Sequence, residues 1–318
     1  MFFEKEPLVS VGIPAHDTNE KLFIRCLDSI VKQTYRNLEI IVSDDSKGNN
    51  VAKTLSRFKD PRIRYIRKKP EGVHANRQLI LRSFKGEFFT FIDSDDAIDP
   101  NYIEFMVKAL SLSSSPFECL VITDYDNINH SSASEAFSIE KIADTGPIDL
   151  FPFKISYSVW GKLFPRKSVY LLDVKLDDGA DDYQIVLKSS LNICEIIKVH
   201  GTKYHYLYNP NSIVHASNDT FLYAYKSYSF VLEKLNHETH ETNRINTLRL
   251  SKLICKARLE SIDYSESFPR SNFFHTVKEI KRFSLRNVKL EKWIKKQAIL
   301  IQRFPLLFLA VSVAKKRR

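Results

Sequence analysis

The chain has 318 residues, of which 43% are hydrophobic and 27% are charged, a composition that supports a large buried core and excludes a disordered protein. The formal net charge is +10 at pH 7, but residues 281–318 contain twelve lysines and arginines and one acid, so the rest of the chain is almost neutral. A nucleic-acid-binding protein more often carries its charge on the folded body, and that class is therefore disfavoured.

The cysteines favour a reducing compartment, and the apolar runs give no sign of a membrane-spanning helix. Four cysteines are scattered without a C-x-x-C pair, which is typical of reduced core residues and not of a disulfide framework or a zinc site. No apolar run reaches the roughly 18 residues that a spanning helix needs. The N-terminus lacks the features of a secretory signal, so we expect a cytoplasmic protein.

Short apolar runs alternate with helical patterns through the first third of the chain. We expect strands at residues 8–13, 38–43, 63–66, 88–92 and 118–123. Helices are expected at 22–33, capped by Thr18 or Asn19, at 73–84, and after Asp99, which would cap a helix that begins at the following proline. This alternation predicts an α/β fold with a mostly parallel central sheet.

Beyond residue 125 the pattern is weaker. The acidic stretch at 176–187 is typical of a helix N-terminus, and strands are expected at 194–200 and 203–208. From about residue 221 the chain becomes helical and increasingly basic.

Polar residues follow the expected strands directly. Pro14, Asp44 and Asp93 each come just after a strand end. In an open parallel sheet these ends lie at one edge, and ligands bind beyond it. The three residues therefore indicate a binding site.

The segment Asp93-Ser94-Asp95-Asp96 concentrates three acids after a strongly apolar run. Two carboxylates one residue apart can hold Mg²⁺ or Mn²⁺ together with a diphosphate. Acids after a strand are often only turn or capping residues. Three like charges packed together are costly without a cation, however, and we favour a metal site.

Several ordered blocks resemble the family 2 glycosyltransferases, which have the GT-A fold. The blocks are VSVGIPAHD (9–17), LDSIVKQTYRNLEIIVSDDS (27–46), GVHANRQ (72–78), FKGEFFTFIDSDDAIDP (84–100), VWGKLFPR (159–166) and ADDY (180–183). The resemblance covers residues 8 to about 215. It implies an inverting enzyme that moves a sugar from a nucleotide-sugar, with a UDP-sugar favoured, to a hydroxyl of a saccharide or lipid-linked acceptor.

The resemblance also implies roles for individual residues. Asp44 corresponds to the acid that binds the base, Arg77 to an arginine near the base and phosphates, and Trp160 to an aromatic near the sugars, although Trp160 is equally typical of a protein core. The full set expected to bind the donor is Pro14, Ala15, Asp17, Asp44, Asp45, Arg77, Asp93, Ser94, Asp95 and Trp160.

Asp182 corresponds to the family's general base, with the neighbouring Asp181 as the alternative and helix capping as the competing interpretation. A carboxylate on the acceptor side can take the proton of the attacking hydroxyl. The expected cofactor is Mn²⁺ or Mg²⁺. Its expected ligands are Asp95, Asp93, Asp96 and His215. His205 lies in the same region, but a lone histidine in an aromatic strand is more often structural.

The expected domains are a GT-A catalytic domain at 1–216 and a helical, basic region at 217–318. The nucleotide-sugar half of the first would span about 1–125 and the acceptor half 126–216. Two other functions stay open: a non-catalytic nucleotide-sugar-binding or scaffold protein, and a nucleotidyltransferase on a related fold.

The tail at 281–318 interleaves cations with apolar residues and includes an eleven-residue apolar run at 304–314. This run is too short to span a bilayer, and the pattern suits contact with the inner face of the cytoplasmic membrane. A helical appendage docked on the catalytic domain is the alternative. The pattern leaves the oligomeric state open.

Overall fold

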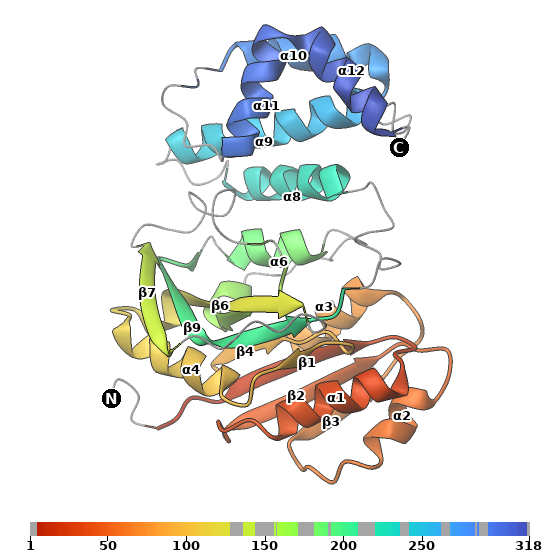
Figure 1. The fold of residues 1–318 in the computed structure, drawn as a ribbon, viewed down its shortest axis with the longest axis vertical. Helices are drawn as coiled ribbons and strands as arrows, with labels where there is room; N and C mark the ends of the chain where they lie inside the picture. Colours follow the sequence, from red (N-terminus) through yellow and green to blue (C-terminus); the bar gives the residue numbers. More distant parts are fainter. Residues whose placement is uncertain are drawn as a thin grey trace. The chain divides into compact units, whose positions relative to one another are not determined.

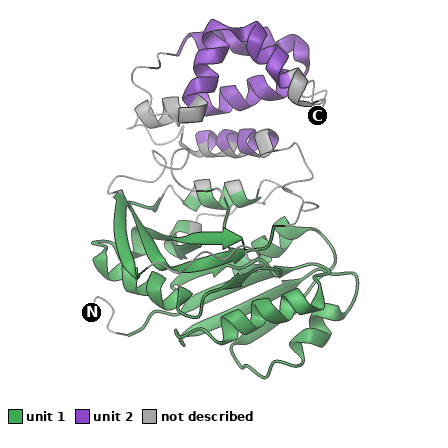
Figure 2. Cartoon of the chain, viewed as in Figure 1, with its two compact units in different colours: residues 1–147, 157–210 green, residues 148–156, 211–318 purple. Residues whose placement is uncertain are grey.

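A computed structural model describes most of the chain. The described residues are 5–127, 136–143, 156, 158–170, 181–189, 192–208, 220–235, 242–261, 268–283, 285 and 292–316. They divide into two compact units (Figure 2). Unit 1 comprises residues 1–147 and 157–210, and unit 2 comprises residues 148–156 and 211–318. This division does not test the predicted domain boundary at residue 216, which stays a prediction.

Unit 1 is built on a nine-stranded sheet with the order β3-β2-β1-β4-β8-β6-β9-β5, and β7 pairs with β9 outside this path (Figure 1). The strands are β1 (Val9–Ala15), β2 (Leu38–Asp44), β3 (Ile63–Arg67), β4 (Phe88–Phe91), β5 (Ala97–Ile98), β6 (Cys119–Asn127), β7 (Ser138–Ala143), β8 (Lys162–Pro165) and β9 (Glu195–Tyr206). The predicted α/β class with a central sheet is confirmed.

The parallel part of the sheet is its N-terminal half. β3, β2, β1 and β4 pair in parallel, as the alternating pattern predicts. β8 then runs antiparallel to both β4 and β6, which makes the sheet as a whole mixed. β8 is not predictable from the sequence, because its four residues lie in a mixed aromatic stretch with no alternating pattern.

Helices cover the sheet of unit 1. They are α1 (Glu20–Val31), α2 (Asn50–Leu55), α3 (Val73–Ser83), α4 (Tyr102–Ala109), α5 (Lys167–Tyr170) and α6 (Asp181–Ser189), with single 3₁₀ turns at Leu110–Leu112 and Pro116–Glu118. Phe23, Cys26, Leu27 and Ile30 recur at helical spacing and form the buried face of α1. Asn19 is its N-cap and accepts from the N–H of Lys21 at 3.0 Å, so one of the two predicted caps is confirmed.

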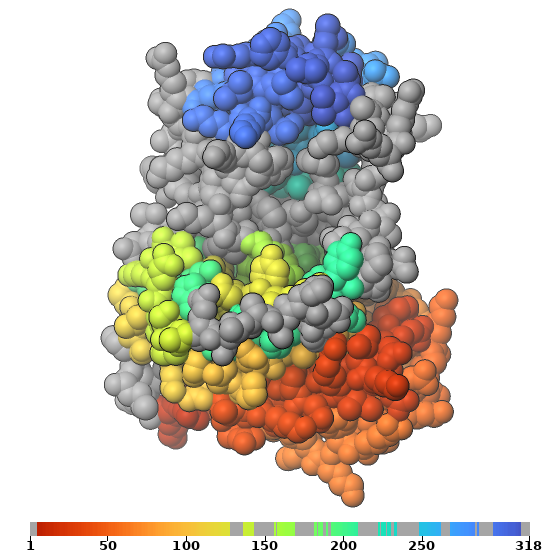
Figure 3. Space-filling model, viewed as in Figure 1, coloured from red at the N-terminus to blue at the C-terminus, as the bar shows by residue number. Residues whose placement is uncertain are grey.

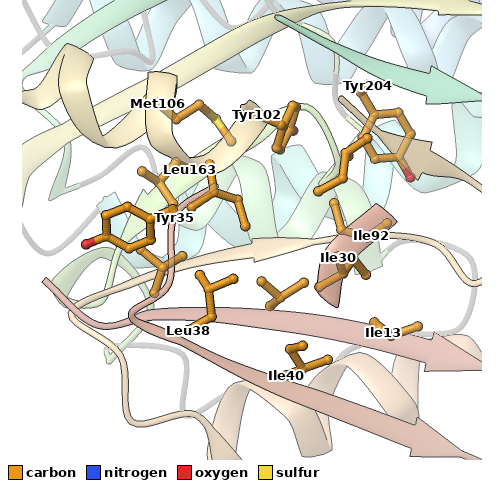
Figure 4. Close-up of a cluster of buried hydrophobic side chains, with 14 of the residues drawn as sticks. Ile13, Ile30, Tyr35, Leu38, Ile40, Ile92, Tyr102, Met106, Leu163 and Tyr204 are labelled. Atoms are coloured by element: carbon orange, nitrogen blue, oxygen red, sulfur yellow. The ribbon is translucent and has the colours of Figure 1, made fainter. Parts of the chain in front are cut away.

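The core of unit 1 lies between the sheet and these helices. Ile13 of β1, Ile40 of β2 and Ile30 of α1 belong to one cluster with Met106 of α4 (Figure 4). All four side chains are fully buried. This cluster fixes the strands whose carboxyl ends carry the polar rim.

Two local predictions were wrong. The helix after Asp99 begins only at Tyr102, because the Asp99 carboxylate instead accepts from the N–H of Lys203 at 2.8 Å and bonds to His205 at 2.8 Å. The two strands expected near residues 194–208 form the single strand β9, whose pairing with β6 is interrupted by an irregularity. Gly201 there has φ +84°, a conformation that glycine adopts without steric cost.

Unit 2 is helical in its described part. Its helices are α8 (Thr220–Leu235), α9 (Thr242–Ser261), α10 (Phe273–Lys281), α11 (Lys292–Arg303) and α12 (Pro305–Lys316), with a 3₁₀ turn at Arg270–Asn272. A separate core joins α9 to α12 and includes Ile254, Phe273, Ile301 and Phe308. In the space-filling view the residues of α10–α12 (blue) form one continuous surface (Figure 3). None of the described helices is both long and apolar enough to cross a membrane.

Candidate active site

Three parallel strands bring the predicted polar residues to one edge of the sheet. β1 lies between β2 and β4, and its last residue, Ala15, is in register with Asp44. β4 ends two residues before Asp93, and the N–H of Ile92 continues the pairing by donating to Gly12 at 3.0 Å. Pro14, Ala15, Asp44 and Asp93 therefore belong to one rim.

Asp44 is fully buried at this rim and has several donors. Its carboxylate accepts from the N–H of Ser46 at 2.8 Å, the hydroxyl of Tyr65 at 2.7 Å and the guanidinium of Arg67 at 2.5 Å. Burial alone would raise the pKa of Asp44, but the hydrogen bonds from these groups lower it. The side chain is therefore a fixed, ionised acceptor.

Asp45 connects the rim to the start of α3. Its carboxylate accepts from the N–H of Gly72 at 2.8 Å and of Glu71 at 3.1 Å, and from the side chain of Asn76 at 2.9 Å. His16 bonds to it at 2.9 Å. Asp45 is thus a buried residue that links the loop after β1 to the loop before α3. Its contact with a nucleotide-sugar stays a prediction.

Asp17 and Ser94 lie in loops that join neighbouring strand ends. Asp17 has φ +43°, an uncommon conformation for a residue with a side chain, and its N–H donates to the hydroxyl of Ser46 at 2.7 Å. Ser94 is within 2.6 Å of the hydroxyl of Thr18, so the loop after β4 is tied to the loop after β1.

Arg77 of α3 joins the two groups of predicted site acids. Its guanidinium donates to Asp93 at 2.9 Å and to Asp181 at 2.5 Å, and it also donates to Asp182. Burial opposes the charge of Arg77, but the three carboxylates raise its pKa well above the usual value. The Nε of Arg77 is buried and has no partner among the residues that the structure describes.

The two candidate bases begin α6, as the acidic pattern predicts for a helix N-terminus. The Asp181 side chain is only 4% exposed, whereas that of Asp182 is 27% exposed. Burial raises the pKa of Asp182 to about 7, against the attraction of Arg77, which lowers it. Asp182 is therefore the more accessible of the two acids, and its carboxyl is still buried enough for its pKa to be raised.

The three acids after β4 have different surroundings. Asp96 is buried, with its two oxygens bonded to the hydroxyl of Tyr204 at 2.5 Å and the N–H of Leu207 at 2.7 Å, and burial raises its pKa to about 8. Asp95 is partly exposed, and within the described residues its carboxylate has no side-chain hydrogen-bond partner. Burial and the neighbouring Asp93 raise the pKa of Asp95.

The charges around these acids leave an excess of negative charge. Five carboxylates lie here among three basic groups, so full ionisation would leave two negative charges uncompensated. Burial and this mutual repulsion raise the pKa values of Asp95, Asp96 and Asp182. The acids are Asp93, Asp95, Asp96, Asp181 and Asp182, and the basic groups are Arg25, Arg77 and Lys162. A divalent cation would offset this excess. Across the described residues no three acidic, histidine or cysteine side chains converge on one metal position, so phosphate oxygens and water would fill the remaining coordination.

Trp160 is part of an aromatic stack beside the acids. It stacks on Tyr204 with ring centroids 4.8 Å apart and on Tyr206 at 5.5 Å, and Tyr125 packs against it edge-on at 5.1 Å. Trp160 is partly exposed, so it packs on the core without being enclosed by it.

Sequence reasoning missed two residues of this site. Tyr204 holds both the N–H of Asp93, at 3.1 Å, and the Asp96 carboxyl. Lys162 is buried, donates to the carbonyl of Ser158 at 2.7 Å, and has a pKa that burial lowers to about 7. Lys162 belongs to the block that resembles the family's W-x-K segment, but a short mixed segment does not indicate that the lysine is buried next to Asp182.

The structure describes one of the two histidines considered as metal ligands, His205. His215 lies outside the described residues. His205 uses both ring nitrogens, which bond to Asp126 at 2.7 Å and to Asp99 at 2.8 Å, and these contacts favour the structural interpretation.

The known proteins that resemble this chain are glycosyltransferases. Residues 10–132 match the model of Glycosyl transferase family 2. Glycosyltransferase GlyA of Streptococcus pneumoniae is 26% identical over 232 residues, which is 68% of this chain and 33% of that protein. An Escherichia coli protein, the UDP-Glc:alpha-D-GlcNAc-diphosphoundecaprenol beta-1,3-glucosyltransferase WfgD, is 28% identical over 54% of this chain and 60% of that protein. The chain thus spans less than two thirds of either relative.

Solved structures share the fold. The crystal structure of S. aureus TarS 1-349 in complex with UDP-GlcNAc has a TM-score of 0.68 and 13% identity, over 97% of this chain and 91% of that one. A second structure of TarS 1-349, in complex with UDP, has a TM-score of 0.63.

Proposed function

Because this chain carries a glycosyl transferase family 2 domain in a GT-A fold, we propose that it moves a sugar from a nucleotide-sugar to an acceptor hydroxyl with inversion at the anomeric carbon. One observation carries this proposal. Arg77 contacts Asp93 of the strand-end acids and both acids at the start of α6, so the proposed donor and acceptor sides meet at one guanidinium.

The proposed donor is a UDP-sugar. Asp44 is ionised and fixed at the end of β2, where a carboxylate can accept from the ring N–H of uracil. TarS was crystallised with UDP-GlcNAc and WfgD is named for UDP-Glc, so hexosyl and N-acetylhexosaminyl donors are the first to test.

Asp93 and Asp95 would hold the proposed Mn²⁺ or Mg²⁺. When bound, such an ion neutralises the charge that develops on the departing diphosphate. Asp95 has no side-chain hydrogen-bond partner within the described part of the chain, and it suits this role best. Asp96 has both oxygens in hydrogen bonds and suits it least.

Asp182 is the proposed general base, ahead of Asp181. As the acceptor oxygen forms its bond to the anomeric carbon, the bond from that carbon to the diphosphate breaks and the hydroxyl proton passes to the Asp182 carboxylate. Its 27% exposure allows an acceptor to approach. The partly exposed ring of Trp160 is the aromatic surface proposed to pack against a sugar ring.

The proposed acceptor is a saccharide or a lipid-linked saccharide in surface polysaccharide or glycolipid synthesis. WfgD is named for a diphosphoundecaprenol-linked acceptor, which belongs to a membrane. We therefore place the protein, as part of the same proposal, at the inner face of the cytoplasmic membrane.

The test is turnover of UDP-Glc, UDP-GlcNAc and related UDP-sugars with Mn²⁺, followed by NMR so that the anomeric configuration of the product is read directly. Asp95→Asn should abolish the metal response, and Asp182→Asn should stop transfer while leaving UDP binding intact. Asp28→Asn, which changes an exposed acid paired with Lys32, is the matched control. Absence of UDP-sugar binding by the unmodified protein, with or without metal, would favour the scaffold interpretation.

A further inference from the structure

Helix α12 exposes apolar side chains where a helix in water usually exposes polar ones. Leu306 is 67% exposed, Leu307 54% and Val311 40%, and Phe304, which directly precedes the helix, is 57% exposed. On the opposite side Phe308 is buried in the core of unit 2. Four large apolar groups on one short segment form a patch and not isolated surface residues.

The helices that share a core with α12 carry many exposed cations. Six exposed cations lie on or next to α10 and α11: Lys278, Lys281, Arg282, Lys295, Lys296 and Arg303. Phe274 and Ile299 add exposed apolar groups on the same helices, at 54% and 37%. Glu279 is the one acid on the described parts of α10, α11 and α12.

We propose that α12 docks unit 2 on an anionic lipid bilayer, with its apolar side chains among the headgroups and acyl chain ends and the cations at the lipid phosphates. A helix of twelve residues is about 18 Å long, too short for the roughly 30 Å of a hydrocarbon core, so it lies along the interface. A purely apolar patch would fit many partners, but exposed apolar residues on a unit whose described helices α10 to α12 expose six cations beside a single acid complement an anionic lipid surface.

Docking would bring the chain to the surface where a lipid-linked acceptor lies, and this purpose rests on the proposed function. The binding itself does not, because it depends on residues of unit 2 alone. The two ideas can therefore fail separately.

The test uses the full chain and sedimentation with vesicles of phosphatidylcholine alone or mixed with phosphatidylglycerol. We expect binding to the anionic vesicles that weakens with salt, and at least a ten-fold loss of partitioning for the double variant Leu306→Gln/Leu307→Gln. The double variant Lys295→Gln/Lys296→Gln should lose mainly the preference for anionic lipid. Leu112→Gln is the matched control, since Leu112 is 57% exposed in unit 1.

Circular dichroism and UDP-sugar turnover without lipid are measured for each variant. Unchanged vesicle binding in the leucine double variant would overturn the proposal. So would a concentration-dependent dimer that this variant abolishes, because the patch would then be covered by a second copy. Loss of vesicle binding with turnover retained supports docking, and vesicle binding without any turnover would leave docking standing and remove the proposed function.

Discussion

The hydroxyl of Tyr204 donates to Oδ2 of Asp96 at 2.5 Å, and the hydroxyl oxygen of Tyr204 accepts from the N–H of Asp93 at 3.1 Å. The ring of Tyr204 stacks on Trp160, 4.8 Å between centroids. One side chain therefore links the acids proposed to hold a metal to the aromatic residue proposed to contact a sugar.

Tyr204→Phe should keep the stack on Trp160 and remove the hydroxyl that orients the loop after β4. Groups that orient metal ligands typically change metal affinity or activity by about 10- to 100-fold when they are lost. We expect a rise of this size in the Mn²⁺ concentration needed for half-maximal turnover. Tyr35→Phe is the control, because the Tyr35 hydroxyl donates to Pro7 at 2.5 Å, away from the site. An equal metal response in both variants would contradict the role of Tyr204.

Arg77→Lys should disable the site although the charge is kept. A single ammonium cannot reach Asp93 and both α6 acids in the forked geometry of a guanidinium. Misplacing catalytic groups by about 1 Å can cost about 100-fold in rate, and we expect a loss of kcat of this order. Arg62→Lys, at a forked contact with Asp60, serves as control and should alter thermal stability alone. A variant at position 77 with normal kcat would show that the three contacts are not needed for transfer.

The pH dependence of kcat/KM should have an acidic limb with a midpoint near 7. Burial raises the pKa of Asp182 to about 7, so below this pH the group is protonated and cannot accept the acceptor's proton. The rate should fall tenfold per pH unit on the acid side and level off above the midpoint. The profile is measured at saturating metal, and a limb near pH 4 would mean that Asp182 is not the base or is not desolvated during turnover.

Lys162→Met should move that acidic limb to higher pH. Lys162 is buried, and its attraction lowers the pKa of Asp182, so its removal favours the protonated form of the acid. Methionine nearly conserves the volume, and the thermal midpoint should change little. A limb that does not move, with the fold intact, would limit Lys162 to its hydrogen bond with the Ser158 carbonyl.

Glu195 should contribute stability that is lost in acid. Burial would raise its pKa, but hydrogen bonds from Ser113, Ser114 and Lys141 lower it to about 2. A lowered folded-state pKa gives stability that is present above the unfolded value of 4.5 and is lost as the pH falls towards 2. Glu195→Gln should therefore lose up to about 3 kcal/mol of unfolding free energy at pH 7 and less at pH 3, by denaturant titration.

The matched control for this substitution is Glu20→Gln, which alters an exposed ion pair with Arg57. Exposed pairs contribute about 0–1 kcal/mol, so this variant should unfold like the unmodified protein at both pH values. An equal loss at pH 7 and pH 3 for Glu195→Gln would point to packing and not to charge.

The parts of the fold that were predictable are those with local causes. Strong apolar runs predicted β1, β2 and β4, and the acids at their ends follow from the direction of parallel strands. The contacts of Arg77 with Asp181 and Asp182 could not be predicted, because they join residues more than a hundred positions apart. Asp99 shows the same limit: its pattern indicates a helix cap, but a distant strand takes its carboxylate instead.

The position of β8 bears on how this chain can be divided. β8 hydrogen-bonds to β4 on one side and to β6 on the other. A strand that begins at Lys162 therefore fills the place in the sheet between two strands that both lie before residue 128. The similarity to the family model stops at residue 132, before β8. A fragment cut at that limit would leave the ladders of β4 and β6 open towards solvent, prone to pair with other chains. The end of the family match is thus not a place where the polypeptide can be divided, and an exchange of the segment that follows it must retain β8 or supply a replacement strand.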